Sequence, residues 1–354
     1  MSSHYEERLQ SDLDWIKDLV GIVGNQLVRN IDDSVKSALT EDKQLAAATV
    51  IGDFTINRQT RELDRLCHAF VARHLPSAGH LRYVSSVLRL NIALERIGDY
   101  ATTIARTAVQ LSERPPENIS RDIEIMSEQA RHTLADALKS FHDRDVDLAK
   151  ATLKAATRFA PYFDRVFDQL AQEASQKTRP AKDLFGVLAT FNRLERVVHQ
   201  AKNLCEESIF VVTGKTKGEK TFQILFVDHD NAGASQIAEH FTRKAFPNSG
   251  TYESAGWAAA EQVEPNFMSF AETVGLDLSK AWPTEFAALT QRLDQFDLVI
   301  TLGSGSSAQI TKLPFHTTCL EWDLDLSASP EEIYRELTPM IRTLIEQLRG
   351  EQAS

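Results

Sequence analysis

The sequence carries one eight-residue motif twice, as LERIGDYA at residues 94–101 and as LERVVHQA at residues 194–201. A second echo relates Asp42-x-x-Leu45-Ala46 to Asp145-x-x-Leu148-Ala149. A repeat of about 100 residues is too long for a stacked solenoid and indicates an old duplication instead. The two motifs therefore predict two related halves up to about residue 212.

Both halves show apolar residues at helical spacing, with breaks near Pro76, at the turn 113–118 and before Pro180. Pro161 lies inside one predicted helix and should kink it or shift its start, because proline cannot donate an interior backbone hydrogen bond. Two three-helix bundles are expected, over residues 1–112 and 118–212. The six helices are expected near residues 5–40, 42–74, 80–112, 118–142, 145–176 and 181–211.

The pattern changes after a polar linker at residues 213–220. Short apolar runs, which are typical of buried strands, then alternate with helical patterns. This alternation predicts a small α/β domain over residues 221–350, with a parallel sheet that is covered on both faces. Strands are expected near 222–227, 297–301 and 317–320, and helices near 235–246, 264–274 and 330–349.

The charge of the chain is unevenly distributed. All 354 residues together carry a net charge of −11, and the segment Thr221–Ser354 alone holds 8 Lys/Arg and 19 Asp/Glu, which is also −11. The first 220 residues are therefore neutral, and two modules with different surfaces are indicated. This balance argues against a nucleic-acid partner, which would require basic phosphate contacts.

The chain has the composition of a cytoplasmic protein. No continuous apolar stretch of the sequence approaches the roughly 18 to 20 residues that are needed to span a bilayer. The start of the sequence lacks the pattern of a signal peptide. Three widely spaced cysteines are typical of a reducing compartment rather than of a disulfide framework.

The first repeated motif places two carboxylates on one helix face. Glu95 and Asp99 are four residues apart and point the same way, and Asp53 on the preceding helix is a third candidate ligand. Oxygen ligands of this kind suit Mg²⁺, Mn²⁺ or iron. The alternative is a solvated helix face on which Arg96 balances the charge.

The helical part resembles PhoU-type proteins. The residues that carry the resemblance are Asp53-x-x-x-Asn57, His80-Leu81-Arg82, Leu94 to Asp99, Leu194-Glu195-Arg196 and Asn203-Leu204-Cys205-Glu206-Glu207. The resemblance covers roughly residues 5–212 and implies a cytoplasmic regulator of phosphate uptake and of the phosphate-starvation response. It also implies contacts with a phosphate transporter component or a sensor histidine kinase, association with the membrane only through such partners, and a homodimer.

The second motif departs from the family pattern. His199 stands where the family has Asp, and Ala156 is opposite Asp53 in the repeat. The remaining candidates are Glu195, His199, Asn203 and Glu206, a mixed set that suits a transition metal such as Fe, Zn or Ni better than Mg²⁺. The alternative for His199 is a hydrogen-bonded helix histidine without a metal.

A loop that follows the first predicted strand opens a helix, and this arrangement is typical of an anion site. Its residues are Asp228, His229, Asp230, Asn231, Ala232, Gly233, Ala234 and Ser235. The loop, Ser254-Ala255-Gly256 and Trp322-x-x-Asp325 resemble low-molecular-weight tyrosine phosphatases and thiol-dependent arsenate reductases over about residues 222–349. The resemblance implies a flavodoxin-type three-layer fold. A metal site at Asp228 and His229 is an alternative use of the loop, and solvated loop residues are another.

The family's loop begins with a nucleophilic Cys and ends with an Arg that clamps the oxyanion. Asp228 stands in the Cys position and Ala234 in the Arg position, and Asp325 matches the general acid. No catalytic residue is therefore expected, and Asp325 is a vestige. A carboxylate about 4 Å from a phosphate oxygen would repel it by roughly 4 kcal/mol per charge pair at an effective dielectric constant near 20.

These observations predict a non-catalytic regulator that requires no cofactor, with a divalent or transition metal (Mg, Mn, Fe, Zn or Ni) on the bundles as an option. Three alternatives remain open. One is a metal-binding or metal-sensing protein, another an oxyanion sensor linked to arsenic resistance, and the third a fusion whose last domain only stabilises a dimer. Loss of the thiol and the guanidinium disfavours an active reductase or phosphatase.

Overall fold

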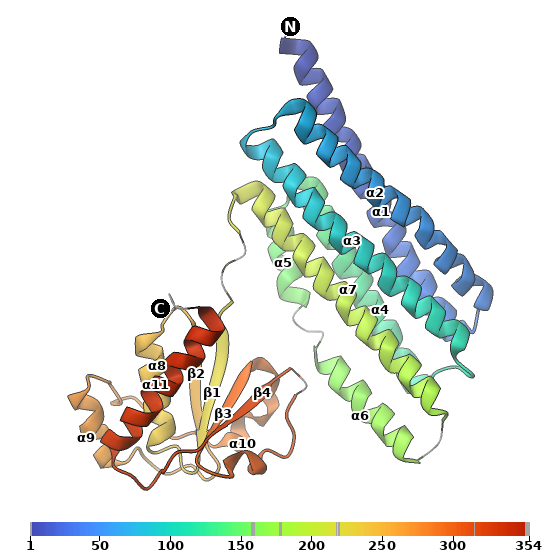
Figure 1. Ribbon diagram of the computed structural model, residues 1–354. Coiled ribbons are helices and arrows are strands. Elements are labelled where there is room, and N and C mark those ends of the chain that lie inside the picture. Colours follow the sequence, from blue (N-terminus) through green and yellow to red (C-terminus); the bar gives the residue numbers. More distant parts are fainter. Residues whose placement is uncertain are drawn as a thin grey trace. The chain divides into compact units, whose positions relative to one another are not determined.

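The computed structural model describes residues 2–156, 160–176, 179–216, 218, 220–314 and 316–350 (Figure 1). The chain forms two compact units, residues 1–217 and 218–354. The first unit is helical, and the second is an α/β domain. The expected fold class, a helical region followed by a small parallel-sheet domain, is thus confirmed. In the described parts of the chain, no helix combines the length and the hydropathy needed to cross a membrane.

The helical unit contains long antiparallel helices (Figure 1). In chain order they are α1 (Ser2–Thr40), α2 (Lys43–His74), α3 (Ala78–Gln110), α4 (Glu117–Asp143), α5 (Val146–Ala156), α6 (Ala160–Gln176) and α7 (Ala181–Thr213). The prediction of one helix over residues 145–176 is wrong, because α5 and α6 are separate. Pro161 is the second residue of α6, where its missing N–H has no helical partner to lose. Residues 157–159 between the two helices lie outside the described residues.

The second sequence echo marks two equivalent helix starts. Asp42 accepts a hydrogen bond from the backbone N–H of Leu45 at 2.9 Å, and Asp145 accepts one from the N–H of Leu148, also at 2.9 Å. The residues before them, Glu41 and Arg144, share the left-handed conformation, with φ of 57° and 56°. The repeat therefore encodes the same local structure twice, with Asp as the N-terminal cap.

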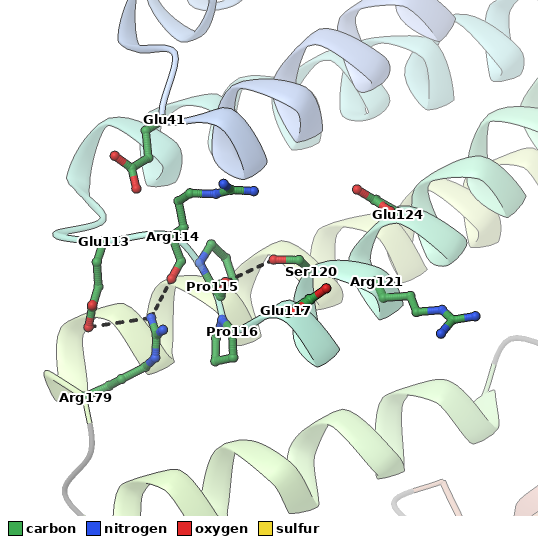
Figure 2. Close-up of a pocket in the computed structure, with 10 residues that line it drawn as sticks. All are labelled: Glu41, Glu113, Arg114, Pro115, Pro116, Glu117, Ser120, Arg121, Glu124 and Arg179. Atoms are coloured by element: carbon green, nitrogen blue, oxygen red, sulfur yellow. Dashed lines mark hydrogen bonds and ion pairs between the residues drawn. The ribbon is translucent and has the colours of Figure 1, made fainter.

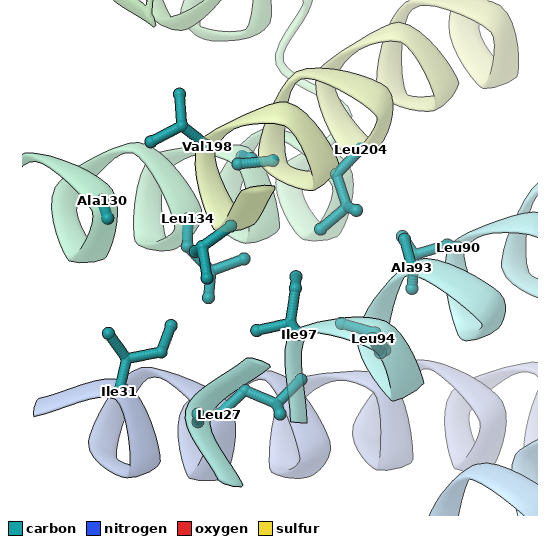
Figure 3. Close-up of a cluster of buried hydrophobic side chains, with 14 of the residues drawn as sticks. Leu27, Ile31, Leu90, Ala93, Leu94, Ile97, Ala130, Leu134, Val198 and Leu204 are labelled. Atoms are coloured by element: carbon teal, nitrogen blue, oxygen red, sulfur yellow. The ribbon is translucent and has the colours of Figure 1, made fainter. Parts of the chain in front are cut away.

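The two halves share one hydrophobic core. α3 packs against α7, and α1 packs against both α3 and α4. Leu94 and Leu194, the first residues of the two motifs, are both fully buried. Figure 3 shows side chains from α1, α3, α4 and α7 meeting in this core. The boundary expected between residues 112 and 118 stays a prediction, since the halves pack together within the first unit.

The α/β unit contains one parallel sheet with the strand order β2-β1-β3-β4. Its strands are β1 (Phe222–Asp228), β2 (Gly250–Gly256), β3 (Leu298–Leu302) and β4 (Thr318–Trp322). Its α-helices are α8 (Ala234–Ala245), α9 (Pro265–Thr273), α10 (Phe286–Leu289) and α11 (Pro330–Arg349). The sequence pattern did not predict β2 or α10.

Alternate side chains of β1 enter two different cores, as the two-residue period of a strand requires. Ile224 and Phe226 pack with residues of α8, α9 and α11, whereas Leu225 and Val227 pack with residues of α10. Helices therefore cover both faces of the sheet, and the expected three-layer arrangement is confirmed.

Candidate functional site

The loop between β1 and α8 lies where ligands bind in parallel α/β folds. β1 is flanked by β2 on one side and β3 on the other, so the connections that leave β1 and β2 run in opposite directions across the sheet. Crevices at the carboxyl ends of strands at such a switch point are the usual ligand sites. Gly256 at the end of β2 makes room for the loop, because a Cβ there would lie 2.7 Å from the backbone N of Asn231.

Asp228 ends β1 and turns its carboxylate into the loop. The side chain is 2% exposed. Its Oδ1 accepts a hydrogen bond from the N–H of Asn231 at 2.7 Å, and its Oδ2 accepts one from the N–H of Ser235 at 2.8 Å. Burial raises the pKa of Asp228 to about 6, although hydrogen bonding by Ser235 and Asn231 opposes the rise. The loop is thus built around one buried carboxylate.

Asn231 holds the loop from the other side. Its φ of 53° lies in the left-handed region, which Asn tolerates better than most residues. Its Nδ2 donates to Ser235 Oγ at 2.8 Å, and its Oδ1 accepts from Gln236 Nε2 at 3.1 Å and from the backbone N–H of Thr284 at 2.7 Å. These bonds join the loop, α8 and the segment before α10 into one rigid network.

Two cavities of about 630 Å³ each flank the loop, and His229 and Leu326 line both of them. One contains the carboxylates of Asp228, Asp230 and Glu264, and the other contains those of Asp323 and Asp325. Among the described residues, no Lys or Arg lines either cavity. In the described part of the chain the surroundings of the loop are therefore acidic, and they contain no Lys or Arg that could bind an oxyanion.

Asp325 lies beside the second cavity as an ionised carboxylate. Its Oδ1 accepts hydrogen bonds from the hydroxyl of Ser327 at 2.6 Å and from its backbone N–H at 3.0 Å. These bonds lower the pKa of Asp325, with the hydroxyl as the larger cause. A general acid must be protonated before it can act, so this environment is unsuited to that role.

The three thiols offer no replacement nucleophile. Cys67 and Cys205 are fully buried in the helical unit, and burial raises the pKa of each to about 12. Cys319 on β4 is half-buried, and burial raises its pKa as well. A reactive cysteine needs a lowered pKa, which none of the three has.

The first acidic motif contains one buried and two exposed carboxylates. Asp53 on α2 is 7% exposed, whereas Glu95 and Asp99 on α3 are exposed. Burial, followed by the negative charge of Asp99, raises the pKa of Asp53. Asn57 donates to Asp53 Oδ2 at 2.9 Å, but Asp53 Oδ1 is buried without a hydrogen-bond partner. Arg106 and the side chain of Thr102 also lie close enough to lower the pKa of Asp53, so its carboxylate is not isolated from compensating groups.

The second acidic motif is arranged differently. Glu195 is buried, Glu206 is half-buried, and His199 and Asn203 are exposed on α7. Asn203 Nδ2 donates to Gln200 Oε1 at 3.3 Å. Within the described residues, no group of three or more His, Cys, Asp or Glu side chains is placed to hold a metal ion. The metal sites of both motifs therefore stay predictions.

Comparison with known families gives the same division of the chain. Residues 21–108 and 123–208 match the PhoU domain. The phosphate-specific transport system accessory protein PhoU homolog 1 of Thermotoga maritima is 31% identical over 199 residues, which are 54% of this chain and 82% of that protein. The chain belongs to the PhoU family.

The PhoU-like region also has a close counterpart among solved structures. The crystal structure of PhoU from Pseudomonas aeruginosa is 26% identical in sequence, covers 58% of this chain and 99% of its own, and gives a TM-score of 0.56. Residues 223–320 match the low molecular weight phosphotyrosine protein phosphatase family. Arsenate reductase from Archaeoglobus fulgidus is 29% identical, covers 36% of this chain and 99% of its own, and gives a TM-score of 0.29.

The resemblance to the phosphatase family implies a Cys and an Arg in the loop. The α/β domain of this PhoU protein has neither residue at those positions. Asp228 stands in the position of the thiol and Ala234 in that of the guanidinium. Gly303 has a φ of 94°, which side chains rarely adopt, so the β3 loop is shaped for a glycine. The scaffold is present, and the nucleophile is absent from its expected place.

A further cavity, which the sequence did not predict, lies where the two PhoU repeats join (Figure 2). It measures about 940 Å³ and is lined by three arginines and four glutamates. Arg179 is one of the lining residues. Its Nη1 donates to the carbonyl of Arg114 at 2.6 Å and pairs with Glu113 at 3.6 Å. Since both charge signs line the cavity, it favours neither anions nor cations.

Proposed function

We propose that this protein is a non-catalytic regulator of phosphate (or related oxyanion) uptake and of the phosphate-starvation response. The duplicated PhoU fold supports the proposal, because the relatives that match both halves carry the name phosphate-specific transport system accessory protein. The regulator acts through contacts with a phosphate transporter component or a sensor histidine kinase. It works in the cytoplasm as a homodimer and reaches the membrane through those partners.

One observation carries the non-catalytic part of this proposal. The position of the attacking thiol holds Asp228, whose two oxygens are already engaged by backbone N–H groups. A carboxylate tied down in this way is a poor nucleophile, and Ala234 supplies no charge to the transition state. The α/β domain therefore serves interaction or sensing rather than turnover.

Deletion of the gene tests the regulatory role. Phosphate uptake and a starvation-induced alkaline phosphatase are measured in the wild type, in the deletion strain and after reintroduction of the full chain. We expect the deletion to change both readouts and the full chain to restore them. Unchanged uptake together with an unchanged starvation response would exclude the role.

A turnover assay tests the catalytic part independently. The purified full chain is offered p-nitrophenyl phosphate, and separately arsenate with a thiol reductant, with an active arsenate reductase as the positive control. We expect no turnover above the buffer rate. Turnover that disappears in Asp325→Asn would show instead that the domain is an enzyme.

A bound cation on the helical unit is a second candidate function, favoured by the burial of Asp53 beside the negative charge of Asp99. A divalent cation there would offset the repulsion between the two carboxylates. Titration with Mg²⁺, Mn²⁺, Fe²⁺, Zn²⁺ and Ni²⁺ is compared for the wild type, Asp53→Asn and Glu195→Gln. We expect Asp53→Asn to lose the binding and Glu195→Gln to retain it. Equal binding by all three proteins would contradict the assignment.

A further inference from the structure

The Asp228 carboxylate stands in the position of the family's nucleophilic thiol and accepts two backbone N–H groups of the loop. Its oxygens accept the N–H of Asn231 at 2.7 Å and the N–H of Ser235, the second residue of α8, at 2.8 Å. Backbone N–H groups at the start of a helix bind oxyanions, because they lack partners in the helix and the helix dipole is positive there. Here two such donors already bind the carboxylate of Asp228, and the N–H of Ala232 donates to Asp230 Oδ1 at 3.0 Å.

The protein fixes the carboxylate in this place from three directions. Asp228 belongs to β1, a central strand of the sheet, and is 2% exposed. Asn231 is locked by the N–H of Thr284 and by Ser235 Oγ. Gly256 at the end of β2 packs so closely against the backbone of the loop that there is no space for a Cβ. The contact is therefore part of the folded core and differs from a transient pairing on the surface.

We infer that the Asp228 side chain is a tethered occupant of the oxyanion loop, which keeps the loop closed to free phosphate, arsenate and sulfate. This inference goes beyond the regulatory role and does not depend on it.

A free anion competes poorly with this occupant. A group attached through the chain acts at a high effective concentration, whereas a free ion loses its translational freedom on binding. The missing Arg at Ala234 leaves a free anion no cationic partner, and no Lys or Arg among the described residues lines the adjoining cavity. The conformation of the loop is therefore independent of the phosphate concentration. Any phosphate that the protein senses has to bind at another site.

Removal of the carboxylate tests the inference. In the full-length Asp228→Ala variant the two N–H donors lose their partner, so formate, acetate or phosphate should bind and raise the melting temperature of the α/β unit. We expect these anions to bind about tenfold or more tightly to the variant than to the wild type, the effect of regaining hydrogen bonds to a charged group. Glu264→Ala is the matched control, because it removes a carboxylate of the same cavity and leaves in place Asp228 and Asp230, which accept loop N–H groups. Equal anion binding by the wild type and Asp228→Ala, or none by Asp228→Ala, would overturn the inference.

A second variant keeps the test decisive if Asp228→Ala does not fold. In Asp228→Ser the shorter, neutral side chain removes the charge and leaves room beside the same two N–H groups. Phosphate or formate should therefore again bind more tightly than to the wild type. Equal anion binding by the wild type and Asp228→Ser would overturn the inference.

Discussion

The Oδ2 atom of Asp228 lies 2.8 Å from the backbone nitrogen of Ser235, and this hydrogen bond joins the end of β1 to the first turn of α8. The presence of Asp at position 228 has two consequences. The family's nucleophile is absent from its position, and the loop's N–H donors gain an anion of the protein's own. Loss of catalysis and closure of the loop therefore follow from one residue.

The ionisation of Asp228 should make the stability of the α/β unit depend on pH. Burial raises its pKa from the ordinary 3.8 to about 6 in the folded protein, so the folded state binds the proton more tightly than the unfolded chain does. The contribution of this group to the free energy of unfolding is therefore highest below about pH 4. It falls by about 3 kcal/mol at most as the pH rises through 6.

Urea unfolding of the wild type and of Asp228→Asn at pH 4 to 7 measures this contribution as a difference. Trp257, Trp282 and Trp322 lie in the α/β unit and Trp15 in the helical unit, so a Trp15→Phe background makes tryptophan fluorescence specific for the α/β unit. Other carboxylates titrate equally in both proteins and cancel. Parallel pH profiles for the two proteins would contradict the prediction.

Gly256 should tolerate no side chain. A Cβ there would lie 2.7 Å from the N of Asn231, and the neighbouring atoms are backbone atoms that cannot rotate away. We expect Gly256→Ala to destabilise the α/β unit by about 1–3 kcal/mol, as overpacking does. Gly218→Ala is the control, since a Cβ at that position meets nothing within 4 Å. A similar urea midpoint for both variants would show that the loop is not closely packed against β2.

Gly98 in the first repeated motif should be required for the burial of Asp53. A Cβ at Gly98 would lie 2.8 Å from Asp53 Oδ1, so Gly98→Ala is expected to cost about 1–3 kcal/mol. Gly52→Ala, on the same pair of helices with nothing within 4 Å, should stabilise the helical unit by about 0.5–1 kcal/mol, because Ala favours the helix. Thermal unfolding followed by far-UV circular dichroism checks both, and changes of the same sign would refute the proposed packing.

Asp42 and Asp145 should each contribute to stability, since each caps a helix through a 2.9 Å bond to the N–H three residues on. We expect Asp42→Ala and Asp145→Ala each to cost about 1 kcal/mol, and the corresponding Asn variants to cost only a few tenths, because Asn retains the capping oxygen. Chemical denaturation of the four variants provides the comparison. If Ala and Asn prove equally costly at either position, the cap explanation fails there.

Most elements of the fold could be predicted because their signals are local. The apolar spacing in the first 212 residues and the run at 222–227 each indicate one type of element. β2 was missed because Gly250 to Gly256 contains small and polar residues instead of an apolar run. The break between α5 and α6 was missed because Pro161 is compatible with both a kink and a new helix start.

The site was predicted less completely. Residue types alone indicated that the loop lacks a thiol and a guanidinium, and that Asp228 would repel an anion. They did not show that its carboxylate points inward and accepts two N–H groups. They grouped Asp53 with Glu95 and Asp99 as candidate ligands but did not show that Asp53 alone is buried.

The sequence by itself determined most of the elements, the duplication and the chemistry missing from the loop, because periodicity and residue type are properties of neighbouring positions. Only the tertiary structure decided which carboxylates are buried and what they bind. The reason is physical: burial and hydrogen-bond partners come from distant segments. Thr284 and Gly256 shape the loop around Asp228, and Gly98 on α3 provides the space beside Asp53 on α2.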